Sequence, residues 1–112
     1  MKLELSDHDT LRIVTVPEAR IDAAVALRFK EAMRMATEGG PDHVVLDLGQ
    51  VRFVDSSGLG AIVAAMKQMG AGRRLDLAGL TPDVAKVFRL TRMDTVFVIH
   101  ADAAAPLPRA AG

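Results

Sequence analysis

The stretch that decides the fold is an apolar run, Val44-Val45-Leu46-Asp47-Leu48, followed after a short connection by the turn Asp55-Ser56-Ser57-Gly58. The run is brief and contains β-branched residues, which predicts a buried β-strand. Beyond the turn, apolar residues recur with the period of one helical face, at Leu59, Ile62, Val63 and Met66. We therefore expect a strand, a connection and an amphipathic helix, with the turn at the start of the helix.

The residues before this stretch predict two strands. Apolar and polar residues alternate around Leu3 and Leu5, and again around Leu11 and Ile13, with a polar turn at residues 7–10 between them. Alternation on both sides of a turn is the pattern of two strands joined by that turn.

A helical period follows Pro17. One apolar face of a helix is predicted from the spacing of Val25, Phe29, Ala32, Met33 and Ala36. Asp22 is placed to cap the start of this helix, and Gly39-Gly40-Pro41 is a typical end.

The second half of the chain repeats the alternation of strand and helix. Residues 74–78 predict a strand, and Thr81-Pro82 predicts the cap and first residue of a helix. The apolar face of that helix would consist of Val84, Val87 and Phe88, and residues 96–99 predict the last strand.

The predicted order is β-β-α-β-α-β-α-β, which indicates an α/β fold with a mixed sheet flanked by helices. We expect one domain over residues 1–100 and an Ala/Pro-rich tail over residues 101–112. Asp102 is a candidate start for a short helix in the tail, but Pro106 and Pro108 should stop it early and leave a frayed end. The core is predicted to include Val44, Leu46, Leu48, Ile62, Val63 and Phe88.

Composition excludes several classes of protein. The 112 residues contain no cysteine, so neither a disulfide framework nor a thiolate zinc site is expected. The charges of fourteen basic and fourteen acidic residues cancel, so the sequence does not predict the basic surface that binding of nucleic acid requires. Acidic residues lie where a signal peptide needs an apolar run, and no apolar stretch approaches the ~20 residues of a membrane helix. We expect a cytoplasmic protein that binds neither a metal nor a cofactor.

The turn is the one conspicuous candidate site. An exposed Ser56 hydroxyl at a helix start suits a phosphate, because free N–H groups and the helix dipole favour negative charge there. Gly58 and Gly60 would leave the backbone uncovered for the close approach of another protein. A plainer interpretation is that Ser56 only caps the helix. That interpretation does not explain two glycines in the first helical turn, each of which costs roughly 1 kcal/mol relative to alanine.

The strand at residues 44–48, the string Phe53-Val-Asp-Ser-Ser-Gly-Leu-Gly60 and the segment Thr81-Pro-Asp-Val-Ala-Lys-Val-Phe88 closely resemble the STAS domain family. The resemblance covers nearly the whole chain and is strongest to the bacterial anti-sigma-factor antagonists. It implies a partner-binding site made of Asp22, Asp55, Ser56, Ser57, Gly58, Leu59 and Gly60. Asp22 matches the end of the family's Gly-x-(Leu/Ile)-Asp motif, although Ala19 stands in place of the glycine.

The resemblance also implies a switch. The unphosphorylated domain would bind an anti-sigma factor that is also a serine kinase, and so release a sigma factor. Phosphorylation of Ser56 would end binding, and a serine phosphatase would reset the domain. We expect a monomer or weak dimer without membrane insertion. The alternative within the family is a STAS subunit of a lipid-transport ATPase complex or of a stress-sensing assembly.

An enzyme is not expected. Gly58-Leu59-Gly60 begins a dinucleotide-binding pattern, but Val63 stands at the third glycine position. The residues before Ser56 do not form the Gly-x-Ser-x-Gly motif of serine hydrolases. The histidines at 8, 43 and 100 are scattered at predicted strand edges, where surface positions are expected. Because the sequence shows no nucleophile paired with a general base, we predict that the domain turns over no substrate.

Overall fold

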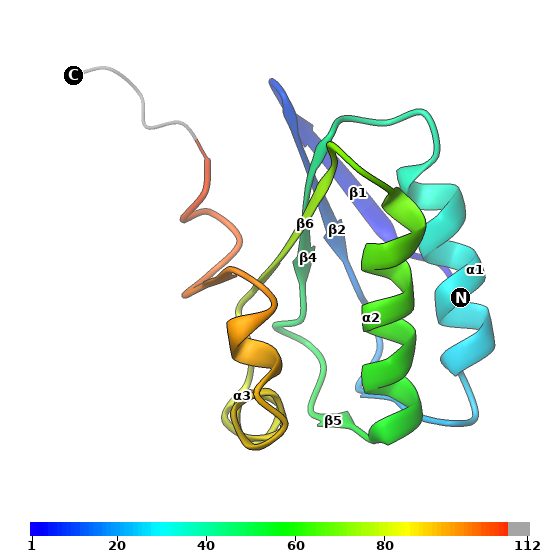
Figure 1. The fold of residues 1–112 in the computed structure, drawn as a ribbon, viewed down its shortest axis with the longest axis vertical. Helices are drawn as coiled ribbons and strands as arrows, with labels where there is room; N and C mark the ends of the chain where they lie inside the picture. Colours follow the sequence, from blue (N-terminus) through cyan, green and yellow to red (C-terminus); the bar gives the residue numbers. More distant parts are fainter. Residues whose placement is uncertain (108–112) are drawn as a thin grey trace.

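The computed structural model describes residues 1–107 and contains a mixed five-stranded sheet with helices packed against it (Figure 1). The elements in chain order are β1 (Glu4–His8), β2 (Leu11–Thr15), β3 (Arg20–Ile21), α1 (Ala26–Thr37), β4 (His43–Asp47), β5 (Phe53–Val54), α2 (Ser56–Met69), β6 (Arg74–Ala78), α3 (Pro82–Leu90), η1 (Met93–Thr95) and β7 (Ile99–His100). The strands of the main sheet lie in the order β1-β2-β4-β6-β7. β1 and β2 are antiparallel, and the other neighbours are parallel.

This architecture confirms the predicted α/β fold with a mixed sheet. The predicted order β-β-α-β-α-β-α-β is recovered when the short strands β3 and β5 and the 3-10 turn η1 are set aside. Those short strands form a separate two-stranded sheet that the sequence did not predict. Two residues are too few for period-2 alternation to stand out, so this sheet left no visible pattern.

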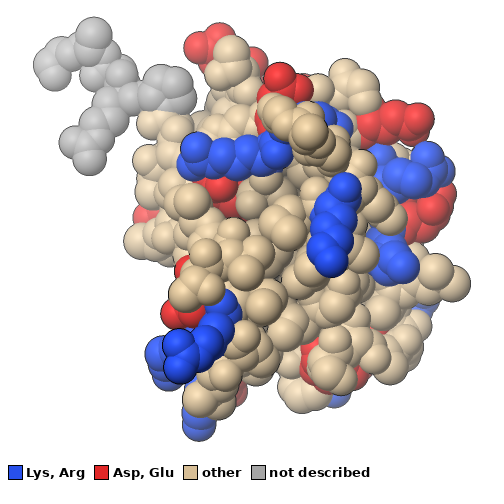
Figure 2. All heavy atoms as spheres, viewed as in Figure 1, with Lys and Arg blue, Asp and Glu red and all other residues tan. Residues whose placement is uncertain are grey.

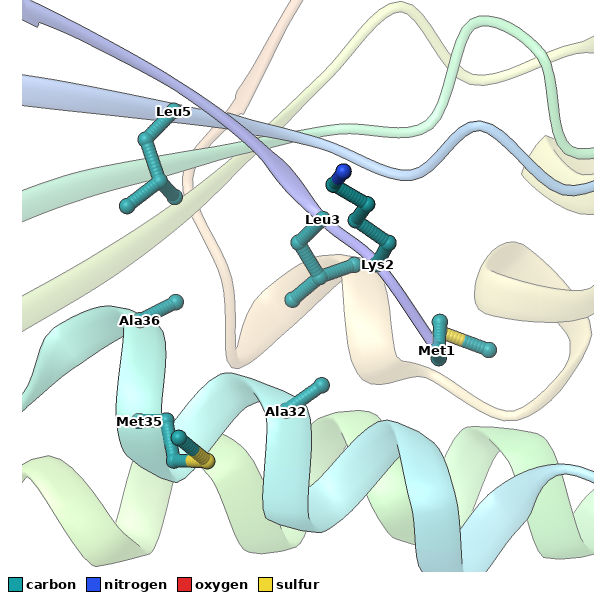
Figure 3. Close-up of a pocket in the computed structure, with 7 residues that line it drawn as sticks. All are labelled: Met1, Lys2, Leu3, Leu5, Ala32, Met35 and Ala36. Atoms are coloured by element: carbon teal, nitrogen blue, oxygen red, sulfur yellow. The ribbon is translucent and has the colours of Figure 1, made fainter.

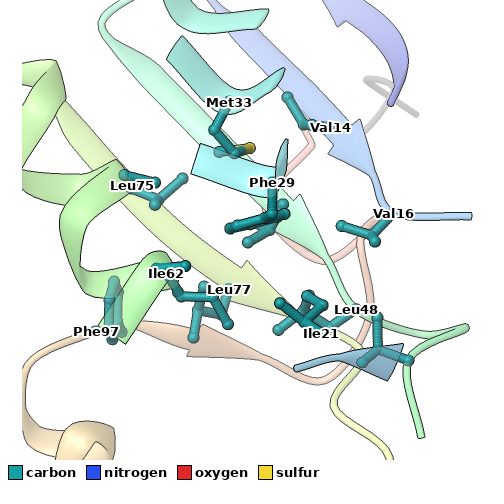
Figure 4. Packing of buried hydrophobic residues seen from close by; sticks show 14 of the residues in the cluster. Val14, Val16, Ile21, Phe29, Met33, Leu48, Ile62, Leu75, Leu77 and Phe97 are labelled. Carbon is teal, nitrogen blue, oxygen red and sulfur yellow. The ribbon is translucent and has the colours of Figure 1, made fainter. Parts of the chain in front are cut away.

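Helices α1 and α2 stand side by side against one face of the main sheet (Figure 1). Phe29 of α1 and Ile62 of α2 are fully buried between the helices and the sheet (Figure 4). Of the predicted core, Val44, Leu46, Leu48, Ile62 and Phe88 are buried, and all five have no exposed surface.

Val63 is the exception in the predicted core, because its side chain is only partly buried. Successive residues of a helix are about 100° apart, so Ile62 and Val63 cannot both point at the centre of the sheet. Ile62 takes the central position, and Val63 lies at the edge of the apolar face.

The last predicted strand is wrong in its bounds. Pairing with β6 covers only Ile99 and His100, instead of residues 96–99. The chain first forms the turn η1, after which the buried ring of Phe97 packs edge-on against Phe88 with 6.1 Å between ring centroids. Hydrogen bonding to β6 starts where the carbonyl of Val98 accepts the N–H of Leu77 at 2.9 Å.

Residues 101–107 pack against part of the other face of the main sheet. Ala103 and Leu107 pack against a small cluster of buried side chains from the strands, Leu11, Ile13, Val45 and Ala78. The helix predicted to begin at Asp102 is absent, because the carboxylate of Asp102 instead caps a turn by accepting the N–H groups of Ala104 and Ala105. The expected fraying concerns residues 108–112, which lie outside the described residues.

Candidate phosphoacceptor and docking site

The predicted turn lies where the small parallel sheet meets the start of α2 (Figure 1). In this sheet Arg20 lies opposite Phe53, and Ile21 lies opposite Val54. Ile21 and Val54 are buried, while Arg20 and Phe53 are exposed. An aspartate follows each strand, so the small sheet delivers both candidate aspartates to the same end of the molecule.

Asp55 is the residue that caps α2. Its Oδ1 accepts the N–H of Gly58 at 2.8 Å, and its Oδ2 accepts the N–H of Ala23 at 3.1 Å. The bond from Gly58 does most to hold the pKa of Asp55 below its ordinary value, with burial opposing and Ala23, Ser57 and the charge of Arg20 assisting. Asp55 is therefore a carboxylate at neutral pH, and it ties the loop after β3 to the helix.

Ser56 is the first residue of α2, and its side chain is exposed. The interpretation of Ser56 as a simple helix cap is wrong, because Asp55 occupies that position and accepts the capping hydrogen bond. Within residues 1–107 the Ser56 hydroxyl makes no hydrogen bond, so no described contact restrains it. Ser57 is also exposed and lies one position further into the helix.

Gly58 and Gly60 differ in their surroundings. Gly58 is buried, and a Cβ atom added to it would lie 1.8 Å from the carbonyl oxygen of Ile21. The expectation that Gly58 offers uncovered backbone to a partner is therefore wrong, because the closely approaching backbone is that of β3. Gly60 is exposed with nothing within 4 Å of an added Cβ, so it stays open to a partner. Leu59 is partly buried and packs against the core.

Asp22 does not cap α1, contrary to the sequence prediction. The helix begins at Ala26 without a side-chain cap. Asp22 instead stabilises the turn before the helix, where its Oδ1 accepts the N–H of Ala24 at 3.1 Å and its carbonyl accepts the N–H of Val25 at 3.0 Å. Its Oδ2 accepts a hydrogen bond from Nε of Arg20 at 3.1 Å.

The alanine at position 19 fits this loop. Ala19 is not among the described residues with positive φ, so its backbone does not require glycine. Its carbonyl oxygen accepts the N–H groups of Arg52 and Phe53 at 2.8 and 3.2 Å. The departure from the family's glycine therefore leaves the pairing of β3 with β5 intact.

The sequence interpretation missed Arg20 and Phe53. The Arg20 guanidinium carbon lies 4.1 Å from the centroid of the Phe53 ring, and Phe53 is one of the exposed large apolar side chains. The two tripeptides Arg20-Ile21-Asp22 and Phe53-Val54-Asp55 each place a β-branched residue between a long side chain and an aspartate. Three residues are too few to predict a strand, so this likeness did not reveal the pair.

A second polar cluster lies in the main sheet, centred on the buried carboxylate of Asp76. Its Oδ2 is 2.9 Å from Nε2 of His43 and 2.9 Å from Nε2 of His100, and Arg74 donates to both carboxylate oxygens. The expectation that these two histidines are scattered surface residues is therefore wrong. Among residues 1–107 no group of side chains is arranged to hold a metal ion.

Other surface features do not bring functional groups together. A shallow groove between residues 1–5 and α1 is mostly apolar (Figure 3), with Met1, Lys2, Leu3, Leu5, Ala32, Met35 and Ala36 as its lining. On the face that Figure 2 shows, basic and acidic side chains are interspersed, and they form no single-sign stripe. None of the helices within residues 1–107 has the length and hydrophobicity that crossing a bilayer requires.

A family model for the STAS domain matches residues 2–105 of the chain. The chain belongs to the STAS domain family. Among curated relatives, the anti-sigma-B factor antagonist of Listeria monocytogenes is 29% identical over 100 residues, a span of 88% of each chain. Such relatives carry the names of regulators, in agreement with the expectation that this STAS domain is not an enzyme.

Solved STAS structures share the fold. An anti-sigma factor antagonist from Mycobacterium paratuberculosis has a TM-score of 0.80 at 24% identity, covering 91% of this chain and 86% of that one. The Bacillus cell fate determinant SpoIIAA in its phosphorylated form has a TM-score of 0.65 at 18% identity, covering 91% and 93% of the two chains. At these identities the likeness concerns the fold alone.

Proposed function

We propose that this STAS domain is an anti-sigma factor antagonist that binds an anti-sigma factor and is switched off by phosphorylation of Ser56. The observation that carries the proposal is the position of Ser56, whose exposed hydroxyl lies at the first residue of α2 and has no hydrogen-bond partner among residues 1–107. The names of the curated relatives support the antagonist role. The partner we propose is an anti-sigma factor with serine kinase activity, and a serine phosphatase would reverse the modification.

The surroundings of Ser56 explain how a phosphate would act. Phosphorylation adds about −1.5 to −2 charges at neutral pH. Asp55 already carries a negative charge at the helix start and already uses the N–H of Gly58. The helix dipole would therefore hold the phosphate less well than it would hold a phosphate at an uncapped helix start.

The phosphate would act on the partner more than on the fold. Ser56 and Ser57 are exposed, so the added group extends into solvent and displaces no core side chain. A partner docked over Ser56 and the open Gly60 would have to remove water from a dianion beside an ionised Asp55. Desolvation of a charged group is costly, which is why we expect binding to be lost without unfolding.

The modification is tested with the purified domain, a purified anti-sigma factor kinase encoded in the same genome, and ATP. We expect one phosphate by intact-mass measurement, located on Ser56 by fragmentation. Ser56→Ala should gain none, whereas the matched control Ser57→Ala should gain one. Phosphate on Ser57 in the wild-type protein would show that the assigned residue is wrong.

Binding is tested with the same partner by calorimetry. Ser56→Asp should weaken the complex more than a hundredfold, which corresponds to about 3 kcal/mol, and should keep the wild-type circular dichroism spectrum. Ser56→Ala should bind like the wild type. If Ser56→Asp binds as tightly as the wild type, negative charge at this position does not control docking and the switch is refuted.

A further inference from the structure

Arg20 and Phe53 form an exposed stacked pair on the small sheet that leads into the Ser56 turn. The guanidinium of Arg20 lies over the Phe53 ring, and its Nε donates to Oδ2 of Asp22. The Arg20 side chain is 59% exposed, against 20% for Asp22. A cation over an aromatic face and a solvent-exposed ion pair are both weak interactions, so the guanidinium can exchange its partners at small cost.

The two aspartates of the site, Asp55 and Asp22, already accept hydrogen bonds. The two carboxylate oxygens of Asp55 accept the N–H groups of Gly58 and Ala23. The carboxylate of Asp22 accepts the N–H of Ala24 as well as Nε of Arg20. A phosphate on Ser56 would thus arrive next to the ionised carboxylate of Asp55, and it would need a cation.

Arg20 is placed to supply that cation. It lies opposite Phe53 in the small parallel sheet, and Phe53 stands two positions before Asp55 and three before Ser56. The planar guanidinium can donate two hydrogen bonds to a phosphate, whereas it gives Asp22 only the one from Nε.

We propose that a phosphate on Ser56 recruits Arg20 as its counter-ion and thereby takes apart the Arg20–Phe53 stack. The inference rests on the proposed function of Ser56 as the phosphoacceptor. In the unmodified domain Asp22 accepts from Nε of Arg20, and the rest of the exposed guanidinium lies beside an aromatic edge, which fits a partner carboxylate next to an apolar side chain. In the phosphorylated domain the phosphate occupies the guanidinium, so it removes a docking contact in addition to obstructing the surface.

The test uses the full chain with phosphoserine incorporated at position 56 during translation, so that no kinase is needed. The second pKa of the phosphate, about 6 in an unperturbed phosphoserine, is followed by phosphorus NMR. A nearby cation lowers the pKa of an acid, so we expect Arg20→Gln to raise this value by roughly 0.5. The matched control is Arg34→Gln. Arg34 is a similarly exposed arginine of α1 that pairs with Glu31 and Glu38, and its loss should leave the phosphate unchanged.

A second measurement uses no substitution at position 20. The chemical shifts of the Arg20 Nε–H and of the Phe53 ring protons should change during the same pH titration. The midpoint of these changes should equal the midpoint of the phosphorus signal. Equal phosphate pKa values in the wild type and in Arg20→Gln would overturn the inference, as would equal shifts in Arg20→Gln and Arg34→Gln. Chemical shifts of Arg20 and Phe53 that stay constant during the titration would also overturn the inference. The two proposals can fail separately, because these measurements do not depend on a kinase. A kinase that never modifies Ser56 would refute the proposed function and leave the result for Arg20 unchanged.

Discussion

The α-carbon of Gly58 faces the carbonyl oxygen of Ile21 so closely that a Cβ atom on Gly58 would lie 1.8 Å from that oxygen. The contact joins the first turn of α2 to β3 through backbone, which cannot move aside as a flexible side chain would. We predict that Gly58→Ala lowers the free energy of unfolding by roughly 1–3 kcal/mol or more, as overpacked sites do. Urea unfolding followed by circular dichroism measures the change.

Gly60 provides the matched control for Gly58. It lies in the same helix with open space where a Cβ would be placed. Because alanine favours a helix over glycine, Gly60→Ala should raise the unfolding free energy by roughly 0.5–1 kcal/mol. Equal effects of the two substitutions would contradict the contact between Gly58 and Ile21.

Ile62 and Val63 should respond differently to truncation. Ile62 is fully buried, so Ile62→Ala should cost roughly 2–5 kcal/mol. Val63 is partly buried, and Val63→Ala removes a smaller side chain that solvent already reaches, so it should cost clearly less. Urea midpoints of the two variants give the comparison. A larger loss for Val63→Ala would mean that the face of α2 is assigned wrongly.

The sequence could predict the elements whose residues repeat over several periods. The strand at residues 44–48 and the helix after the turn have enough apolar positions to define a buried face, and both are confirmed. Phe29 and Met33 define the face of α1 in the same way. These parts are predictable because burial of apolar surface dominates the local choice of structure.

The details of the site could not be predicted, since they depend on contacts between distant segments. Gly58 is needed because of Ile21, and Asp55 binds Ala23, 32 positions earlier in the chain. The residues around one position do not show which distant residue that position will contact in the folded chain. The same limit applies to His43 and His100, which meet at Asp76 only after three parallel strands have assembled.

Asp55 and Ser56 should differ in their effect on stability. Asp55→Ala removes the acceptor for the N–H groups of Gly58 and Ala23, and loss of a helix cap costs typically about 1 kcal/mol. Ser56→Ala removes a hydroxyl that is exposed and engaged with no described residue, so it should be nearly neutral. Thermal unfolding of the two variants at one pH is sufficient. A costly Ser56→Ala with a neutral Asp55→Ala would mean that the serine is the cap.

The Asp76 cluster gives the domain a specific response to acid. Burial of this carboxylate raises its pKa, but the hydrogen bonds from Arg74, His100 and His43 outweigh burial and lower the pKa from 3.8 to about 2. A lowered pKa means that the folded state binds the proton less readily than the unfolded state does. The stabilisation is therefore fully present above about pH 5 and is lost as the pH falls through 3.8 towards 2.

Replacement of Asp76 should remove this response. The shift corresponds to about 2 kcal/mol at neutral pH, so Asp76→Asn should lower the unfolding free energy by about that amount at pH 7. Between pH 5 and 2 the wild type should lose stability more steeply than the variant, and the two curves should converge. Denaturant unfolding at closely spaced pH values measures both, with the exposed Asp94→Asn as the control that should follow the wild type. A constant difference between wild type and Asp76→Asn down to pH 2 would show that the charge of Asp76 is not what stabilises the cluster.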